Sequence, residues 1–574
     1  MLATRQLRYN DQKNTLSQSL VRLYADRSQL VQYQYTYGDP ALGQIPDALV
    51  QMQADGRWVS FAYDRLGRLS QRSLAFAGTT KSQSYTYQTN AQGNDTTRIA
   101  TYTDLLGTTH TYTYDANGNI LTDSYSGLTY SYEYDSQDRL VRVNDPVQNL
   151  TQTYTYDDRG NCTRKDTYAY TTGALGTGTA QFYGYGYQAW PDALTWAGGE
   201  LLSYTGGNPD NWTQNRSFAW SGGRNLQSVY QNDTLLALYN YDSAGLRVSK
   251  LTGTGSTQYY ILDSQYQGQV STINGQSYTL SYYWDEAGAP MGVKLNGSAY
   301  FFVKNLQGDV VAITDYQGNV VARYTYDVWG KVLSVVNGAG NPVTDPTHVA
   351  NLNPFRYRGY FYDTETGFYY VSSRYYDPEI GRWINADSLV STGQGILGNN
   401  MFVYCLNNPV NYIDRDGTNA EALQWWTTGM GWLPFADTAL PIGDIIYVGG
   451  ILLLGAFALA SDQDYVPEIS YDEVDVAYGP PSPNNDDDDD DYDDYYDDES
   501  NFGGRQKVGK NKGNAPGNNQ AQNKQFRDAT KGLTPDQQRI VHDKITGKGL
   551  GYHEIKAVIK DLFVFVFGLF AFEE

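Results

Sequence analysis

The chain has 574 residues, too many for one ordinary core, so several domains or an array of repeats are expected. Tyrosine occurs 53 times and glycine 58 times, a composition that favours strands and turns over long helices. With only two cysteines in the sequence, a disulfide framework is excluded. The opening residues, MLATRQLRYNDQKN, lack the apolar stretch of a secretory signal. We therefore expect no N-terminal signal peptide, and we expect the chain to be the carboxyl-terminal portion of a longer protein.

The formal net charge of −22 is distributed unevenly. Residues 1–415 carry 29 Lys and Arg against 35 Asp and Glu. Residues 416–504 carry 21 acidic residues and no Lys or Arg, whereas residues 505–574 carry 12 basic and 7 acidic residues. These three blocks give the first division of the chain into domains.

A phrase of the form Tyr-x-Tyr-Asp recurs along the first block. Its aspartates Asp115, Asp135 and Asp157 are separated by 20 and 22 residues. Further copies surround Asp64, Asp242 and Asp327, and degenerate copies read YTYQTNAQGN, LTWAGGELL and FAWSGGRNL. At least nine copies at a nearly constant period predict a repeat architecture.

Each copy reads as a β-hairpin. The alternation Tyr-Thr-Tyr places two rings on one face of a strand. The aspartate then caps a turn by accepting hydrogen bonds from backbone N–H groups, and the following Gly or Asn tolerates a positive φ. We interpret these tyrosines and aspartates as the material of a wall and not as an active site.

The repeats resemble the YD repeats of bacterial Rhs and teneurin-like proteins over roughly residues 5–418. That resemblance implies a mainly β fold in which the hairpins spiral into a long sheet, closing as a hollow shell around the carboxyl-terminal segment. Coiling the strip so that successive turns pair would also remove most of its exposed strand edges. We expect residues 1–352 to be this shell.

Residues 353–418 contain the most specific motif, NPFRYRGYFYDTETGFYYVSSRYYDPEIGRWINADSL followed by NMFVYCLNNPVNYIDRDGT. They are similar to the Rhs repeat-associated core. The resemblance implies that this segment closes the shell and cuts the chain just after itself, with paired aspartates in two Asp-Pro-x-Gly motifs. Asp387 and Asp414 match those aspartates, but DSLV replaces the first motif and Arg415 stands in place of the second proline.

Two closely placed carboxylates can share one proton, so that one acts as an acid while the other activates water. A nearby cation would tune such a pair, and Arg374 and Arg382 are the candidates. The resemblance places the cut just past Gly417, near Thr418 to Asn419. The alternative is that both aspartates only cap turns, as the repeat aspartates do, and the sequence leaves these two interpretations evenly balanced.

Two segments connect the core to the end of the chain. Residues 419–461 include the apolar run IIYVGGILLLGAFALA at 445–460, shorter than the roughly 20 residues of a spanning helix. It is either a translocation helix that meets a membrane or a buried helix that plugs the shell. Residues 462–512 contain DDDDDDYDDYYDDE, which predicts a disordered acidic linker. The run lacks the glycine and spaced ligands of a calcium loop, and we expect neither a metal nor a cofactor.

Residues 513–574 predict a small, basic, α-helical tip resembling the terminal domains of other polymorphic toxins. Two histidines there are each followed by an acid, as His542–Asp543 and His553–Glu554. A histidine beside a carboxylate is a usable general acid or base. Basic side chains suited to a phosphodiester surround them: Lys524, Arg527, Lys531, Arg539, Lys544 and Lys548. The tip is either a nuclease acting on nucleic acid or a binding domain in which these residues are structural.

The leading functional interpretation is a fragment of an Rhs-type polymorphic toxin, secreted or held at the surface of a bacterium. Its shell would deliver the toxic tip in contact-dependent competition, with a cognate immunity protein and a delivery machinery as partners. The alternative is a cell-surface adhesion or carbohydrate-binding protein without enzymatic activity.

Overall fold

The computed structural model describes residues 3–9, 16–23, 29–46, 48–90, 93, 95–187, 190–388 and 397–422. The chain divides into two compact units, Met1–Gly479 and Pro480–Glu574, and every described residue belongs to the first. The predicted apolar run at 445–460, the acidic linker and the helical tip therefore lie outside the described residues. Within the ranges given above, the structure contains no helix with the length and apolar character needed to cross a membrane.

The first part of the chain is an antiparallel meander in which each strand pairs with the next along the chain. Its strands are β1 (Ala3–Tyr9), β2 (Leu16–Leu23), β3 (Gln29–Tyr37), β4 (Leu49–Ala54), β5 (Arg57–Tyr63), β6 (Leu69–Phe76), β7 (Thr79–Thr89), β8 (Asp95–Thr103), β9 (Thr109–Tyr114), β10 (Ile120–Tyr125), β11 (Leu128–Tyr134), β12 (Leu140–Asp145), β13 (Leu150–Tyr156), β14 (Cys162–Ala169), β15 (Thr179–Tyr187), β16 (Trp190–Ala197) and β17 (Glu200–Leu201). A short helical turn, η1 (Pro40–Leu42), interrupts the path between β3 and β4.

A small hairpin of β18 (Tyr204–Thr205) and β19 (Asn208–Pro209) leads into a second meander of thirteen strands. These are β20 (Asn211–Trp212), β21 (Arg216–Ser221), β22 (Asn225–Gln231), β23 (Thr234–Tyr241), β24 (Arg247–Thr252), β25 (Gly255–Leu262), β26 (Gln265–Ile273), β27 (Gln276–Trp284), β28 (Pro290–Leu295), β29 (Ser298–Lys304), β30 (Val310–Thr314), β31 (Val320–Tyr326) and β32 (Val332–Asn337). The prediction of a mainly β fold is confirmed. We call residues 3–337 the wall.

The repeat aspartates cap the hairpin turns as predicted. In one copy, Asp135 Oδ1 accepts hydrogen bonds from the backbone N–H groups of Gln137 at 2.9 Å and Arg139 at 3.0 Å. The guanidinium Nε of Arg139 donates to Asp135 Oδ2 at 2.6 Å. The aspartates that accept from the residues two and four positions later also include Asp64, Asp157, Asp242, Asp315 and Asp327. Each motif aspartate therefore fixes its own turn through contacts within five residues of chain.

The tyrosine just before the aspartate has a second role that the sequence did not predict. The Tyr134 hydroxyl donates to the backbone carbonyl of Ile120 at 2.8 Å, and the Tyr156 hydroxyl donates to that of Leu140 at 2.7 Å. Tyr63, Tyr114, Tyr241 and Tyr326 make the corresponding bond to an earlier strand. Tyr87 and Tyr185 also make it, although no aspartate follows them. The hydroxyl thus ties each repeat to the one before it, which explains a preference for tyrosine over phenylalanine.

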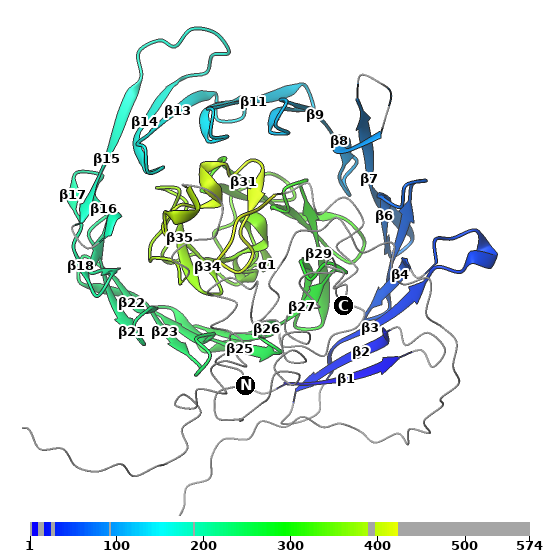
Figure 1. Ribbon diagram of the computed structural model, residues 1–574. Coiled ribbons are helices and arrows are strands. Elements are labelled where there is room, and N and C mark those ends of the chain that lie inside the picture. The colour runs from blue at the N-terminus through cyan, green and yellow to red at the C-terminus, as the bar shows by residue number, and fades with distance from the viewer. Residues whose placement is uncertain are drawn as a thin grey trace, which may run out of the picture. The chain divides into compact units, whose positions relative to one another are not determined.

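Later strands of the wall pack on the earliest ones. Lys294 Nζ lies 2.6 Å from Asp55 Oδ2, and the Tyr102 hydroxyl donates to the backbone carbonyl of Lys304 at 2.7 Å. The rings of Phe76 and Phe301 meet edge to face, with centroids 5.7 Å apart. Accordingly β27 and β29 lie beside β3–β6 in Figure 1. Strands more than 200 residues apart thus share one hydrophobic core, as a coiled strip requires and as separate globular beads would not.

The segment after the wall is packed against the inner side of its curve (Figure 1). It contains α1 (Val349–Leu352), η2 (Tyr357–Gly359), β33 (Phe361–Asp363), β34 (Phe368–Val371), β35 (Arg374–Asp377), β36 (Arg382–Trp383), η3 (Leu397–Asn399), η4 (Cys405–Asn407), β37 (Tyr412–Ile413) and β38 (Glu421–Ala422). Strands β33–β36 form a four-stranded sheet, and every residue of β34 and β35 is buried. Within this segment, we call residues 353–422, which follow α1, the core segment.

Asparagines of the core segment reach successive turns of the wall. The Asn400 amide donates to Asn161 Oδ1 at 2.8 Å, and the Asn407 amide donates to the Gly160 carbonyl at 2.7 Å. The Asn408 amide contacts the preceding two turns, at Asn119 Oδ1 (3.0 Å) and at the Asp138 carbonyl (2.7 Å). Asn411 also donates to the hydroxyl of Tyr134 in the same region, at 3.0 Å. Asparagine side chains of the core segment therefore fix its position on the wall by hydrogen bonding to the turns of successive repeats.

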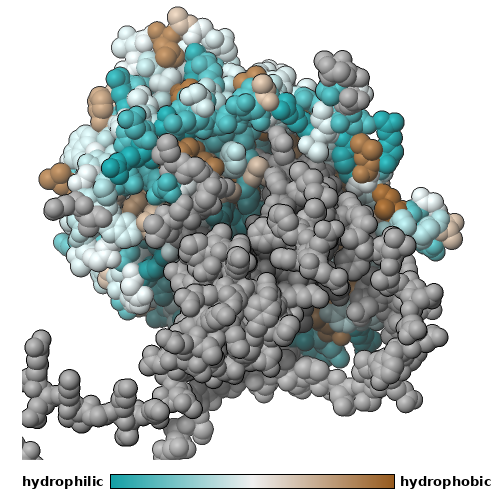
Figure 2. Space-filling view, in the orientation of Figure 1, coloured by the Kyte–Doolittle hydropathy of each residue, from teal (hydrophilic) through white to brown (hydrophobic). Residues whose placement is uncertain are grey.

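The face of the molecule seen in Figure 2 is mainly hydrophilic where it is coloured, with scattered apolar spots. The large apolar side chains most exposed among the described residues, Leu201, Leu42 and Leu66, lie far apart in the chain. Single exposed apolar side chains are normal on soluble surfaces and do not mark an interface.

Candidate functional site: a buried aspartate pair on one arginine

The structure brings Asp387 and Asp414 together at the carboxyl-terminal end of the core segment. Arg374 begins β35, Asp387 follows β36 and Asp414 follows β37. One nitrogen, Arg374 Nη2, lies 2.9 Å from Asp387 Oδ2 and 3.0 Å from Asp414 Oδ2. All three side chains are at most 4% exposed. Two carboxylates and one guanidinium therefore form a compact buried group with one net negative charge when all are ionised.

Arg382, the other predicted cation, lies elsewhere. Its Nη2 donates to Asn161 Oδ1 at 2.9 Å and to Asn400 Oδ1 at 3.3 Å, so it holds the core segment on the wall. Of the two candidate cations, Arg374 contacts the aspartate pair and Arg382 contacts Asn161 and Asn400 instead.

Burial raises the pKa of the Asp414 carboxyl to about 7. Arg374 opposes this rise, and the negative charges of Asp416 and Asp387 add to it. Burial also lowers the pKa of Arg374, but a guanidinium remains charged in proteins. Near neutral pH, Asp414 can thus carry a proton while Arg374 stays paired with Asp387, a division of roles that acid–base catalysis by two carboxylates requires.

Asp414 also caps a turn, as the alternative interpretation predicted. Its Oδ1 accepts from the backbone N–H groups of Gly417 at 2.9 Å, Thr418 at 2.9 Å and Asn419 at 3.3 Å. Its two oxygens therefore do different work, since Oδ2 faces Arg374 and Oδ1 faces the chain that follows. The capping role and a chemical role are compatible in this geometry.

A small cavity adjoins the pair. Its volume is about 20 Å³, and a space of this size admits about one water molecule. Its lining includes both aspartates and Arg374, together with Met401, Leu406 and Thr418. A single water placed there would touch the carboxylates and the chain just past Gly417.

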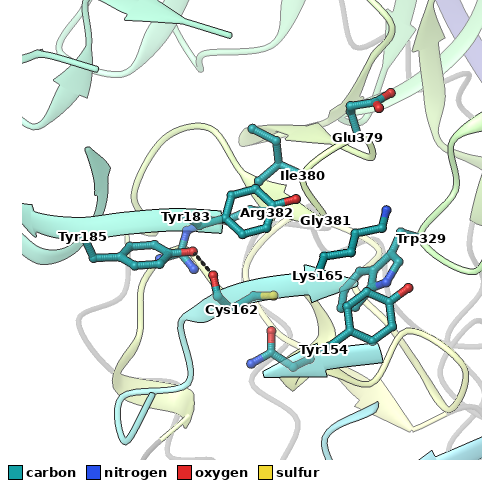
Figure 3. A pocket seen from close by; sticks show the side chains of 11 residues that line it. Tyr154, Cys162, Lys165, Tyr183, Tyr185, Trp329, Glu379, Ile380, Gly381 and Arg382 are labelled. Atoms are coloured by element: carbon teal, nitrogen blue, oxygen red, sulfur yellow. Dashed lines mark hydrogen bonds between the residues drawn. The ribbon is translucent and has the colours of Figure 1, made fainter. Parts of the chain in front are cut away.

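A second cavity, of about 10 Å³, lies where β14 and β15 meet the core segment (Figure 3). Cys162, Lys165 and Tyr154 line it, and the Tyr185 hydroxyl donates to the backbone carbonyl of Cys162 at 2.8 Å. Burial raises the pKa of the Cys162 thiol to about 12, so it stays protonated at neutral pH and is a poor nucleophile. This cavity holds at most about one water molecule and is too small for a ligand.

The other predicted site residues, His542, Asp543, His553 and Glu554, lie outside the described residues. In the part of the chain that the structure describes, no group of three or more His, Cys, Asp or Glu side chains is placed to hold a metal ion. Of the two predicted sites, the aspartate pair lies within the described residues and the histidine pair of the tip does not.

Comparison with known proteins agrees with the repeat and core motifs. The family model described as the teneurin YD-shell matches residues 23–183 and 210–410. The tRNA3(Ser)-specific nuclease WapA of Bacillus spizizenii is 32% identical over 227 residues, covering 39% of this chain and 9% of the relative. The double-stranded DNA deaminase toxin A of Burkholderia cenocepacia is 25% identical over 365 residues, covering 63% and 19%. Teneurin-3 of Mus musculus is 22% identical over 367 residues, covering 62% and 11%.

Among solved structures, the crystal structure of TcdB2-TccC3 aligns with a TM-score of 0.46 and 17% sequence identity, covering 72% of this chain and 26% of that chain. The chain spans between 9% and 19% of the length of the three curated relatives.

Proposed function

Because the chain belongs to the teneurin YD-shell family, we propose that it is the shell-forming part of a polymorphic toxin that delivers its own carboxyl-terminal tip in competition between bacteria. Residues 1–352 would form the shell, 353–418 its closing core and 513–574 the toxic tip. The observation that supports this most is the seating of the core segment on successive wall turns, with the aspartate pair at its exit. Two relatives named as a nuclease and a deaminase toxin support a toxic cargo.

The remaining parts of the proposal follow from this role. A toxic tip requires a cognate immunity protein in the producing cell, and delivery requires a secretion machinery that places the protein outside the cell or on its surface. The apolar run at 445–460 would either cross the target membrane or plug the shell until release, and the acidic linker at 462–512 would connect it to the tip.

The aspartate pair would free the tip by cutting the chain just past the core segment. Asp387, held by Arg374, takes a proton from a water molecule as the water oxygen attacks a peptide carbonyl carbon. Asp414, protonated near neutral pH, gives its proton to the nitrogen that leaves, and the C–N bond breaks. The products are a new carboxylate and a new amino terminus, so atoms and charge balance without a metal or cofactor.

This assignment predicts how the rate of self-cleavage depends on pH. Asp414 must be protonated to act as the acid, and its pKa is raised to about 7. We therefore expect the first-order rate to fall about tenfold for each pH unit above pH 7, because the protonated fraction falls in that proportion. Time courses between pH 6 and pH 9 on denaturing gels measure this. A rate that rises with pH would contradict Asp414 as the acid.

The toxic tip is tested by producing residues 501–574 alone inside a bacterial cell. We expect growth to arrest, and we expect His542→Ala to relieve the arrest because His542 beside Asp543 is the proposed acid or base of the tip. Asn519→Ala in the same segment is the matched control and should remain toxic. Degraded RNA or DNA in arrested cells, absent in the His542 variant, would identify a nuclease.

A tip without effect on growth would contradict the toxin proposal and favour the adhesion or carbohydrate-binding alternative. Arrest with intact nucleic acids would contradict the nuclease and direct attention to the apolar end of the tip, residues 563–572.

A further inference from the structure

Four charged side chains meet inside the wall, where its late strands pack on its early ones. We call the region in which β27–β29 pack on β3–β6 the overlap (Figure 1). Arg72 enters the overlap from β6, on the early side. Asp285 and Glu286, in the turn after β27, and Lys304, at the end of β29, enter it from the late side. The four side chains are between 7% and 20% exposed, so two positive and two negative charges are largely removed from water.

The surroundings of Arg72 are otherwise apolar or neutral. Its Cζ lies 6.0 Å from the centroid of the Phe61 ring, and its Nη2 lies 3.4 Å from Met291 Sδ. Its Nη1 donates to Gln83 Oε1 at 3.4 Å, and its buried Nε has no hydrogen-bond partner among the described residues. A buried cation in such a setting depends on the carboxylates beside it.

The two carboxylates of the overlap are not held equally. Asp285 Oδ2 lies 2.8 Å from Lys304 Nζ, and Asp285 Oδ1 accepts two backbone N–H groups of its own turn, at 3.1 and 2.8 Å. Glu286 Oε2 lies 3.3 Å from Arg72 Nη2, which is also 3.9 Å from Asp285 Oδ2. Asp285 is therefore fixed within the late strands, whereas Glu286 forms the contact that crosses from the late strands to the early ones.

The different environments shift the two pKa values in opposite directions. Burial raises the pKa of the Glu286 carboxyl, with Arg72 opposing the rise and Asp285 adding to it. Burial acts on Asp285 in the same sense, but Lys304 and Arg72 outweigh it and lower the pKa of that carboxyl. The titratable and charged side chains that face Glu286 are Arg72 from β6, Asp285 of its own turn, Lys304 from β29, Tyr63 from β5 and Tyr85 from β7.

The sign of the pH dependence follows from these directions. When the overlap opens, water reaches Glu286 and its pKa returns toward the ordinary value of 4.5. The closed overlap therefore binds the proton of Glu286 more tightly, and closure gains stability as the pH falls through the raised pKa toward 4.5. Asp285 contributes stability above its ordinary value of 3.8 that is lost only in stronger acid. The overlap is thus most firmly closed in mild acid.

We propose that the Arg72–Glu286 contact makes the overlap a pH-sensitive closure of the wall, firmly closed in mild acid and more readily opened at neutral and alkaline pH. A strip of hairpins that coils onto itself can open along the line where its turns overlap without breaking the pairing between neighbouring strands. The inference goes beyond the proposed function and requires neither self-cleavage nor a toxic tip.

Hydrogen–deuterium exchange of the full chain, followed by mass spectrometry at about pH 5 and about pH 7.5, tests the proposal. Exchange is expressed as protection factors, which divide out the direct effect of pH on the amide chemistry. We expect amides of β6, β28 and β29 to be protected about threefold more, or better, at the lower pH, because the closed state there holds one more proton.

Glu286→Gln isolates the group responsible. The amide is neutral, as the protonated carboxyl is, so the variant should show the parent's acid protection at both pH values and a ratio near one. Buried aspartates elsewhere also have raised pKa values, but they are present in both proteins and cancel in the comparison. Glu133→Gln is the matched control, because Glu133 pairs with Arg142 and its side chain is 59% exposed; it should keep the parent's pH dependence.

Arg72→Met gives a second signature. It leaves the Glu286 carboxylate in the overlap without its cation, so protection of β6, β28 and β29 should fall at about pH 7.5 and be largely restored at about pH 5, where protonation neutralises the carboxyl. General damage to the fold would not be repaired by acid.

Equal protection of the parent at the two pH values, or a Glu286→Gln variant that keeps the parent's pH dependence, would overturn the inference. Self-cleavage and toxicity are measured separately, by fragment mass and by growth, so the failure of either is distinguishable from the failure of the pH-sensitive overlap.

Discussion

Asp414→Asn should slow self-cleavage by about a thousandfold or more, because the amide cannot give up a proton as the carboxyl does. Asparagine keeps an oxygen that can accept from the backbone N–H groups of Gly417 and Thr418, so the turn itself should survive. The substitution therefore separates the chemical role of Asp414 from its capping role. Asp387→Asn should have an effect of similar size, since it removes the base. Gel time courses of the full chain made in a cell-free reaction give the rates.

Asp242→Asn is the matched control for this pair. Asp242 caps its turn in the same manner, with Oδ1 accepting from Ala244 N and Leu246 N at 2.9 Å each, but it belongs to the wall. Cleavage by this variant should match the parent. If Asp414→Asn also cuts at the parent rate, the aspartate pair is structural and the cut, where it occurs, has another cause.

Arg247→Ala should destabilise the protein by about 3–5 kcal/mol, the usual effect of removing one partner from a buried ion pair. Arg247 of β24 lies 2.6 Å from Asp363 of the core segment, and both side chains are 1% exposed. Lys250 lies 2.9 Å from the other oxygen of Asp363. Loss of Arg247 leaves a buried carboxylate with one remaining cation, so the core segment should separate from the wall more readily. Urea unfolding followed by tryptophan fluorescence measures the change.

An exposed ion pair between wall and core is the control. Lys331 lies 2.8 Å from Glu379, with side chains 44% and 45% exposed. Because water screens such a pair, Lys331→Ala should cost less than about 1 kcal/mol. Equal losses for the two variants would show that burial of the Arg247–Asp363 pair contributes nothing special to the seating of the core.

Local features of the fold could be predicted from the sequence because their causes are local. The repeat aspartates fix turns within five residues, so the phrase around Asp135 predicts its own hairpin. The tyrosine hydroxyls donate to backbone carbonyls about 15 residues earlier. The repeat contains this spacing, but the sequence does not indicate which carbonyl accepts the hydrogen bond.

Long-range contacts could not be predicted in this way. The choice of Arg374 over Arg382 depends on strands that meet only in the folded chain. Asn400 and Asn407 find partners about 240 residues away, and the segment NMFVYCLNNPVN shows only that asparagine is frequent there.

The departures from the Asp-Pro-x-Gly pattern raised doubt that the pair would form. In the structure, Arg415 stands where proline is usual, and its side chain turns away from the pair, toward Glu421 at 3.6 Å and the Ala287 carbonyl at 3.3 Å. Asp414 keeps its contacts with Arg374 and with the turn. Arg415 in place of proline therefore leaves intact the contacts of Asp414 that the proposed self-cleavage requires.

The most direct test of this account is the intact mass of the purified full-length chain after incubation near pH 6.5. The account predicts two fragments that meet just past Gly417, near Thr418 to Asn419, and whose masses sum to that of the chain plus one water. A single uncut species that persists at this pH, in a protein that is folded by its unfolding transition, would contradict it.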